Sequence, residues 1–297
     1  MQHLLISGGT GLIGRHLIKR LLSSYKITVI SRDPARAKRL LGDAVAITEL
    51  AEITDLENID GIINLAGEPI TDKRWTDSQK QRICHSRWDI TEKLVELIHN
   101  ATVKPKVFIS GSAVGFYGRQ GDTPVTEDHS DCHDEFSREV CKRWEDTALN
   151  ATDATRVCII RTGVVLAEEG GALQKMMIPF RLGLGGPIGS GKQFIPWIHT
   201  DDMLRAIIFL LEDDACHGPF NVTSPNPNTN HFFAIKLAAR LERPCFFRMP
   251  ASFIKFLMGE SSDLVLFGQK AMPRRLQTAG FVFNYPTLIE ALDGLDL

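Results

Sequence analysis

An apolar stretch that stops at three evenly spaced glycines constrains this chain more than any other feature. Residues 4–6 read Leu-Leu-Ile, Gly8, Gly11 and Gly14 follow, and "RHLIKRLL" continues with the apolar spacing of a helix. Glycines between a strand and a helix allow a tight turn, a close approach to a ligand and close helix packing. A glycine-rich turn without a ligand is the alternative, but a strand and a helix flank the turn correctly. The opening therefore predicts a turn that binds a dinucleotide pyrophosphate at a helix N-terminus.

The end of the second apolar strand indicates which dinucleotide is bound. In "KITVISRDPARAKRL" the strand ends at Ser31 and Arg32, where an NAD-binding protein carries Asp or Glu for the ribose hydroxyls. Ser31 can donate a hydrogen bond to a 2′-phosphate, and Arg32 can pair with that phosphate and stack beside the adenine. Asp33, one position later, counts against this, and a solvated Arg32 is the alternative. We predict NADP(H) as the cofactor.

Strands and helices then alternate along the chain. Strands are predicted in "GIINLAG", "KVFISGSAVGFYG" and "TRVCIIRTGVVLA", and helices in "RICHSRWDITEKLVELIHNA" and "EFSREVCKRWEDTALNA". This alternation predicts an α/β fold with a doubly wound parallel sheet of the Rossmann type and right-handed crossovers.

A smaller C-terminal substrate lobe is predicted where the pattern changes after Val165. We expect residues 1–165 to form the nucleotide-binding domain, with 193–222 returning to it, including "FIPWIH" and "GPFNV" as strands of the large sheet. Residues 166–192 and 223–297 would form the small lobe. "GPIGSGKQ" fails the P-loop spacing and predicts a turn that places Lys192 or Gln193 toward the cleft. Arg274 and Arg275 could contact a substrate phosphate or lie in solvent.

Several motifs together resemble one protein family. These are "GGTGLIG", "NLAG", "SGSAVGFYG", "RTGVVL" and "FIPWIHTDDMLRAI". With them the chain resembles the extended short-chain dehydrogenase/reductases, specifically the NAD(P)-dependent epimerase/dehydratase family. The tail "GQKAMPRRLQTAGFVFNYPTLIEALDGL" looks like that of a subgroup without a firm biochemical assignment. The motifs and the resemblance assign the following residues to the cofactor: Gly8, Thr10, Gly11, Leu12, Ile13, Gly14, Ser31, Arg32, Leu65, Ala66, Gly67, Arg87, Ser110, Gly111, Thr162, Gly163 and Val164.

The acid/base pair that the resemblance implies is incomplete. Family members normally carry Tyr-x-x-x-Lys on the helix after the serine strand, where the Lys lowers the pKa of the Tyr. If Glu145 is aligned with the acidic residue one turn past the Lys, the Tyr position falls on Ser137 and the Lys position on Cys141. Lys142 points about 100° away around the helix. Only Ser112 of the usual triad remains, so both the reaction and catalysis itself stay open.

Other residues are candidates for a catalytic role beside Ser112. Tyr117 could act as an acid, although a Tyr-Gly in relatives is usually structural. Glu68 could face the nicotinamide, or it could be a loop residue paired with an arginine. Arg87 could approach the phosphates or Glu68, or it could be a surface arginine. His199 could titrate near neutral pH, or it could be a structural contact at a helix start.

Composition limits the classes of partner that we expect for this chain. A net charge of -2 and a pI near 6.5 give no reason to expect nucleic acid. The longest apolar runs are too short to span a bilayer, and no secretory signal is visible, so we expect a cytoplasmic protein with no membrane partner. The six scattered cysteines are expected to be free thiols. We expect no metal site, because "HSDCH" lacks a second ligand pair. A monomer or homodimer that binds a small molecule is expected.

Two functions remain from these features. The first is an NADP(H)-dependent oxidoreductase or epimerase that acts on a sugar-like or nucleotide-linked small molecule. The second is a regulatory or sensor protein that binds NADP(H) without chemistry, which the missing Tyr and Lys favour. A structural role without a nucleotide is a third alternative. The three glycines count against it, because they lie where a bound pyrophosphate would require them.

Overall fold

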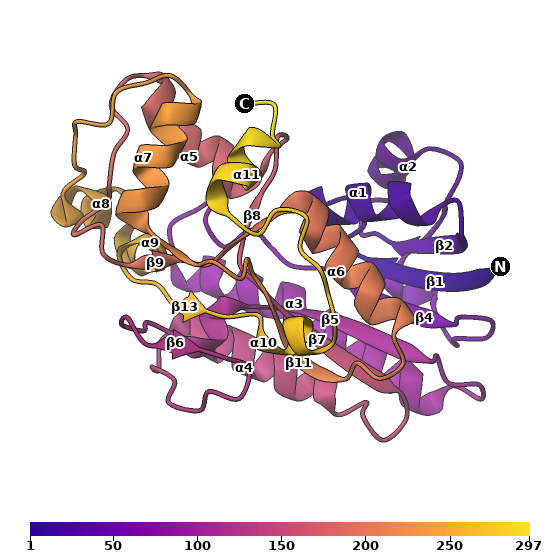
Figure 1. The fold of residues 1–297 in the computed structure, drawn as a ribbon. Helices are drawn as coiled ribbons and strands as arrows, with labels where there is room; N and C mark the ends of the chain where they lie inside the picture. The colour runs from indigo at the N-terminus through magenta and orange to yellow at the C-terminus, as the bar shows by residue number, and fades with distance from the viewer.

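A seven-stranded parallel sheet forms the centre of the computed structural model, which describes residues 1–297 (Figure 1). The strand order is β11-β7-β5-β4-β1-β2-β3, and all pairings are parallel. The predicted doubly wound, Rossmann-type sheet is thereby confirmed. The strands are β1 (Gln2–Ser7), β2 (Tyr25–Ile30), β3 (Ala46–Thr48), β4 (Gly61–Asn64), β5 (Val107–Ala113), β7 (Arg156–Thr162) and β11 (Gly218–Val222).

Helices cover both faces of the sheet, which explains why its strands are almost continuously apolar. Side chains alternate along β1, so that Leu4 and Ile6 face one side and Leu5 faces the other. The first side packs against α1 (Leu12–Leu21) and α6 (Thr200–Glu212). The second packs against α3 (Asp77–Asn100) and α4 (Phe136–Leu149). The helix α2 (Pro34–Leu41) connects β2 to β3.

The strand order reverses at β1, which lies between β2 and β4. The chain runs from β1 to β2 and β3 on one side and then crosses back to β4 on the other side of β1, which opens a crevice at the carboxyl ends of the strands. Ligands of open α/β sheets bind in this crevice. The topology thus places the glycines after β1, the polar residues after β2 and the loop after β4 at one edge of the sheet.

The small lobe has its own core. Its helices are α5 (Gly171–Arg181), α7 (Asn230–Arg240), α8 (Ala251–Met258) and α11 (Leu288–Asp293). Trp197, Phe233 and Leu292 are among the buried side chains that join α5, α7 and α11. Figure 1 shows these helices grouped beside the sheet rather than over it.

Two details of the predicted lobes differ from the structure. "GPFNV" joins the large sheet as β11, but "FIPWIH" does not. Pro196 has no N–H and divides it into β9 (Phe194–Ile195), which pairs with β12 (Asn228–Thr229), and β10 (Trp197–His199), which pairs with β8 (Val164–Leu166). The C-terminal segment does not belong to the small lobe alone, because Leu276 and Phe281 pack in the core beside the large sheet.

Short elements complete the chain. The strands β6 (Pro124–Val125) and β13 (Lys270–Ala271) pair with each other, which ties the tail to the loop after β5. The remaining helices are η1 (Leu50–Glu52), η2 (Val114–Tyr117), η3 (Gly259–Ser262), α9 (Asp263–Leu266) and α10 (Arg274–Thr278). None of the helices combines the length and the apolar character that a bilayer crossing requires.

Candidate functional site

The glycines after β1 form a cradle in which Gly8 and Gly14 have no room for a side chain. Gly8 has a φ of +70°, and a Cβ there would lie 2.4 Å from the carbonyl oxygen of Leu65. A Cβ on Gly14 would lie 2.4 Å from the carbonyl oxygen of Gly8. Helix α1 begins after Gly11 without a side-chain cap and without an acidic residue in its first turn. These glycines and Leu65 line a cavity of about 190 Å³. Free N–H groups beside a space of this size fit the pyrophosphate of a dinucleotide.

The polar residues after β2 have separate tasks. The Asp33 carboxylate accepts a hydrogen bond from the Arg36 backbone N–H at 2.9 Å and caps α2. Ser31 is partly exposed, and its hydroxyl lies 3.0 Å from the Asp33 carbonyl oxygen. Arg32 is exposed beside it. The acidic residue at this end of the crevice is therefore engaged with the backbone.

Side-chain hydrogen bonds fix the start of the loop after β4. Ser7 donates to the Asn64 side chain at 2.5 Å, and Asn64 donates to Thr91 on α3 at 2.8 Å. These bonds fix the ends of β1 and β4 relative to each other. The segment 65–67 then runs directly against the side chain of Arg87. A Cβ on Gly67 would lie 2.9 Å from the Arg87 Cζ atom.

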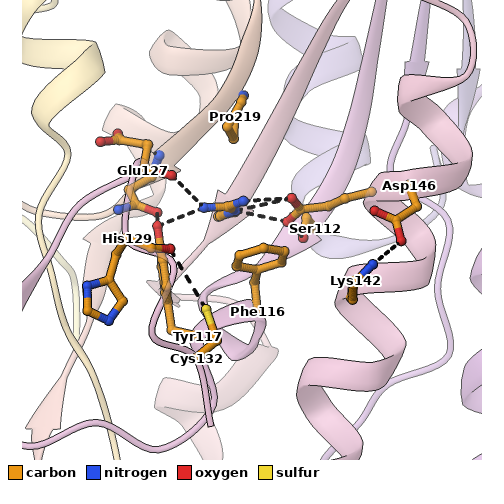
Figure 2. A network of polar contacts seen from close by, with 12 residues as sticks. Ser112, Phe116, Tyr117, Glu127, His129, Cys132, Lys142, Asp146 and Pro219 are labelled. Carbon is orange, nitrogen blue, oxygen red and sulfur yellow. Dashed lines mark hydrogen bonds and ion pairs between the residues drawn. The ribbon is translucent and has the colours of Figure 1, made fainter. Parts of the chain in front are cut away.

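Ser112 lies at the end of β5 in a buried polar network (Figure 2). Its hydroxyl donates to Glu145 Oε1 at 2.6 Å. Arg161 donates to both carboxylate oxygens of Glu145, with a closest contact of 2.8 Å. Arg161 also lies 3.6 Å above the ring of Phe116. Burial lowers the pKa of Arg161, but the carboxylate of Glu145 outweighs burial and holds that pKa above its ordinary value. The proton of Ser112 is thus directed toward a carboxylate inside the protein.

Tyr117 lies in the interior of this network, which fits the structural alternative better than the candidate acid. Its side chain has no exposed surface. Its hydroxyl lies 2.8 Å from Asn221 Oδ1 and 3.0 Å from the Thr126 carbonyl oxygen, and it accepts from Arg161. Burial raises the pKa of Tyr117 to about 12. A hydroxyl with these partners and no exposed surface fits a structural role in the network.

The expected Tyr and Lys positions are covered by η2. A Cβ on Gly115 of η2 would lie 3.3 Å from the Cβ of Ser137 and 3.7 Å from the Sγ of Cys141. Ser137 donates to Glu135 at 2.6 Å, and burial raises the pKa of Cys141 to about 12. Lys142 points away and pairs with Asp146 on the outer side of α4 (Figure 2). Neither position carries a group that titrates near neutral pH.

Glu68 and His199 have local partners. Glu68 accepts from Gln79 at 3.4 Å and lies 3.8 Å from Lys73, so it belongs to a loop network on the side of α3. His199 is buried, caps α6 by accepting from the Asp201 N–H at 3.1 Å and stacks on Tyr285. Burial lowers the pKa of His199, so its imidazole is neutral at pH 7. This arrangement fits the structural alternative for His199.

The residues expected on the substrate side are mostly engaged elsewhere. Gln193 donates to the carbonyl oxygens of Ile188 and Val265, and Lys192 is exposed in the same turn. Arg275 donates to the carbonyl oxygens of Pro219 and His217 beside β11, so it ties the tail to the sheet edge.

Sequence reasoning missed Arg161 and Asn221 as parts of the network. A charged residue inside the apolar run "CIIRTG" was an available signal for Arg161, since a buried charge requires a partner. No comparable signal marks Asn221, which is buried at the end of β11.

Comparison with protein families and curated proteins supports the resemblance. A model of the NAD dependent epimerase/dehydratase family matches residues 4–223, and a domain of unknown function, DUF1731, matches residues 249–295. The Arabidopsis thaliana "epimerase family protein SDR39U1 homolog, chloroplastic" is 38% identical over 295 residues, which cover 97% of this chain and 84% of that protein. An epimerase family protein of Staphylococcus epidermidis is 35% identical, with 99% of both chains covered.

Solved structures show the same relationship. The crystal structure of human epimerase family protein SDR39U1 with NADPH matches with a TM-score of 0.91 and 34% identity, over 100% of both chains. UDP-glucuronic acid 4-epimerase from Bacillus cereus in complex with NAD matches with a TM-score of 0.78 at 17% identity, over 99% of this chain and 97% of that one, which shows a shared fold alone. From the glycine cradle, the sheet order and these matches, we conclude that the chain belongs to the NAD dependent epimerase/dehydratase family.

Proposed function

We propose that this chain binds NADP(H) across the carboxyl ends of β2, β1 and β4 and is an oxidoreductase or epimerase for a sugar-like or nucleotide-linked small molecule. One observation carries the coenzyme preference. The carboxylate of Asp33 caps α2, which leaves Ser31 and Arg32 as the polar side chains available to a 2′-phosphate. The NADPH in the human SDR39U1 structure supports the same preference.

Different residues of the chain would bind different parts of the coenzyme. The N–H groups at the start of α1 would bind the pyrophosphate, since a helix N-terminus favours negative charge. Ser31 and Arg32 would bind the adenosine 2′-phosphate. When bound, the nicotinamide supplies or accepts a hydride. Gly163, at the end of β7, has no room for a side chain, because a Cβ there would lie 2.6 Å from the carbonyl oxygen of Pro196.

Replacing Arg32 tests the coenzyme preference. We expect Arg32→Ala to raise the dissociation constant for NADPH by about 10–100-fold, because hydrogen bonds to charged groups contribute about 1.5–3 kcal/mol. The dissociation constant for NADH should stay unchanged, since NADH has no 2′-phosphate. Isothermal titration calorimetry measures both, and Arg39→Ala on the exposed side of α2 is the control. Wild-type protein that binds NADH as tightly as NADPH would contradict the proposal.

A sensor without chemistry is the second candidate, and the polar network favours it. The Ser112 hydroxyl is directed to Glu145, and the Tyr and Lys positions hold Ser137 and Cys141 under η2. Absorbance of the reduced nicotinamide, followed with a panel of carbonyl compounds, separates the two functions. Oxidation of NADPH supports an oxidoreductase. An epimerase returns the hydride to its substrate and leaves the absorbance unchanged, so the stereochemistry of candidate nucleotide-linked sugars is followed in parallel. Tight NADPH binding without either reaction supports the sensor.

A further inference from the structure

Large apolar side chains gather on the surface of the small lobe. Half of the large apolar side chains that the chain exposes lie in residues 178–189 and 241–258, a small fraction of its length. Phe246 is 89% exposed and Phe256 is 78% exposed. An exposed apolar surface of this kind marks a site of interaction with another molecule or with a membrane. We call the following side chains the apolar tip: Ile178, Leu182, Leu184, Phe246, Phe247, Phe253, Phe256 and Leu257.

Backbone pairing brings the two stretches of the apolar tip together. The Met249 N–H donates to the carbonyl oxygen of Pro187 at 2.9 Å, and the Gly189 N–H donates to the carbonyl oxygen of Met249 at 2.8 Å. Helix α8 begins at Ala251, directly after this pairing. The end of α5, the chain before Met249 and helix α8 therefore adjoin one another. Figure 1 shows α8 at the end of the molecule away from β1 and β2.

Packing within the chain does not account for the apolar character of α8. The helix reads "ASFIKFLM" and buries only one of its eight residues, Ile254. A surface helix of a globular protein normally presents polar side chains to water. Phe253, Phe256 and Leu257 are exposed instead. This helix face therefore has the composition of a surface that is covered by a partner.

The charged side chains in the two stretches are almost all cations. Glu242 is the single carboxylate. The exposed cations are Arg181, Arg243, Arg248 and Lys255. None of the four forms an ion pair within the chain, and Arg248 donates to the Ser190 carbonyl oxygen at 3.3 Å. Because the whole chain has a net charge of -2, the apolar tip is a positive region on a slightly negative molecule and is complementary to an anionic partner.

Among the possible partners, a lipid surface matches this chemistry best. A second copy of the chain would place the cations of the two tips against each other, and like charges across an interface oppose association. A protein partner would need pockets for side chains that protrude as far as Phe246 and Phe256. An anionic bilayer needs no such pockets, because Phe and Leu enter the boundary between headgroups and acyl chains while Lys and Arg contact the lipid phosphates.

We propose that the apolar tip binds the surface of an anionic lipid bilayer, with Phe246, Phe256 and Leu257 in the interface and Arg248 and Lys255 at the lipid phosphates. Contact of this kind does not cross the bilayer, so it requires no spanning helix. The expectation of no membrane partner rested on short apolar runs and on a missing secretory signal, neither of which describes the surface. Binding to lipid is independent of the proposed binding of NADP(H).

Co-sedimentation of the full chain with lipid vesicles tests the proposal. Vesicles of equal parts phosphatidylglycerol and phosphatidylcholine are compared with vesicles of phosphatidylcholine alone. We expect the wild type to bind the mixed vesicles at least about 10-fold more strongly at low salt, because the cations are attracted to the anionic surface. The difference should shrink as the salt concentration rises, since salt screens this attraction.

Two exposed phenylalanines test the apolar contribution. Phe246→Ser combined with Phe256→Ser should weaken binding to the mixed vesicles by about 10–100-fold, because two large apolar side chains no longer enter the interface. Val103→Ser removes an exposed apolar side chain in the loop after α3 and is the control, which should bind like the wild type. All of these side chains are exposed, so circular dichroism and thermal unfolding should match the wild type and show that each variant is folded.

Two exposed cations test the contribution of charge. Arg248→Gln combined with Lys255→Gln should weaken binding to the mixed vesicles by about 10–30-fold and leave binding to phosphatidylcholine unchanged. Arg82→Gln combined with Arg39→Gln, on α3 and α2, removes the same charge elsewhere and should have less than about a threefold effect.

Three results would overturn the proposal. The first is a wild-type protein that stays in the supernatant with both kinds of vesicle; concentration-dependent association in analytical ultracentrifugation would then assign the apolar tip to a second copy. The second is equal binding to the two kinds of vesicle, which would remove the role of the cations. The third is an equal loss for Val103→Ser and the phenylalanine variant, which would place the lipid contact elsewhere. Calorimetry with NADPH tests the proposed function separately and does not depend on any of these results.

Discussion

Glu145 and Arg161 form a buried ion pair beside the end of β5. Their side chains are 3% and 5% exposed, and Ser112 and Tyr117 attach to the pair. Removing one charge would leave the other uncompensated in the interior. We expect Glu145→Gln to lower the free energy of unfolding by about 3–5 kcal/mol, measured by urea denaturation.

An exposed ion pair provides the control for this substitution. Glu92 lies 3.2 Å from Arg143, and both side chains are more than half exposed. Glu92→Gln should cost less than about 1 kcal/mol, because water screens the pair. Similar losses for the two variants would contradict the view that the buried pair supports the end of β5.

Helix α1 depends on glycine at its first turn for its distance from β1. A Cβ on Gly14 would lie 2.4 Å from the Gly8 carbonyl oxygen and 2.7 Å from the Gly9 Cα atom, and these backbone atoms cannot move without shifting the cradle. We expect Gly14→Ala to destabilise the protein by about 1–3 kcal/mol and to weaken NADPH binding by more than about 10-fold. Thermal unfolding with and without NADPH measures both effects.

Gly121 is the matched control for the cradle. A Cβ there would meet no atom within 4 Å, and its backbone is not in the left-handed region. Gly121→Ala should therefore leave both stability and NADPH binding unchanged. If Gly14→Ala behaved in the same way, α1 would not need its close approach to β1.

At the scale of the whole molecule, the segment after β4 connects the two lobes. Asp72 pairs with Lys175 on α5, and Arg74 donates to the carbonyl oxygens of Leu257, at 3.0 Å, and Phe256 at the end of α8. Lys80 at the start of α3 pairs with Glu260 of η3. All three contacts join the large lobe to the small lobe on the side of the crevice.

Arg74 allows this connection to be tested. We expect Arg74→Ala to speed amide exchange in residues 251–258 by about fivefold, because a partly exposed hydrogen bond to carbonyl groups contributes about 1 kcal/mol. Exchange in β1 and β4 should not change, since their bonds lie within the large sheet. Arg82→Ala removes another exposed arginine, on the neighbouring helix α3, and is the control for hydrogen-exchange mass spectrometry. Uniform acceleration throughout the chain would contradict a local connection.

Features that depend on short-range patterns are specified by the amino-acid sequence alone. Apolar strands alternating with helices specified the parallel sheet, because both faces of such a sheet must be covered. Gly8 and Gly14 specified the cradle, because a Cβ at either position would collide with backbone atoms of the turn. The absence of the Tyr and Lys was equally visible, since one helix contains both positions.

The surroundings of those positions depend on how distant segments pack in three dimensions. It placed η2 over Ser137 and Cys141, directed Ser112 to Glu145, and brought Arg87 from α3 beside the end of β4. It also divided "FIPWIH" between two short pairings instead of the large sheet. Spacing within one element fixes which face a side chain occupies, but it does not identify the partner from another element. Such partners are selected by packing and by the need to satisfy buried charge, which act between segments far apart in the sequence.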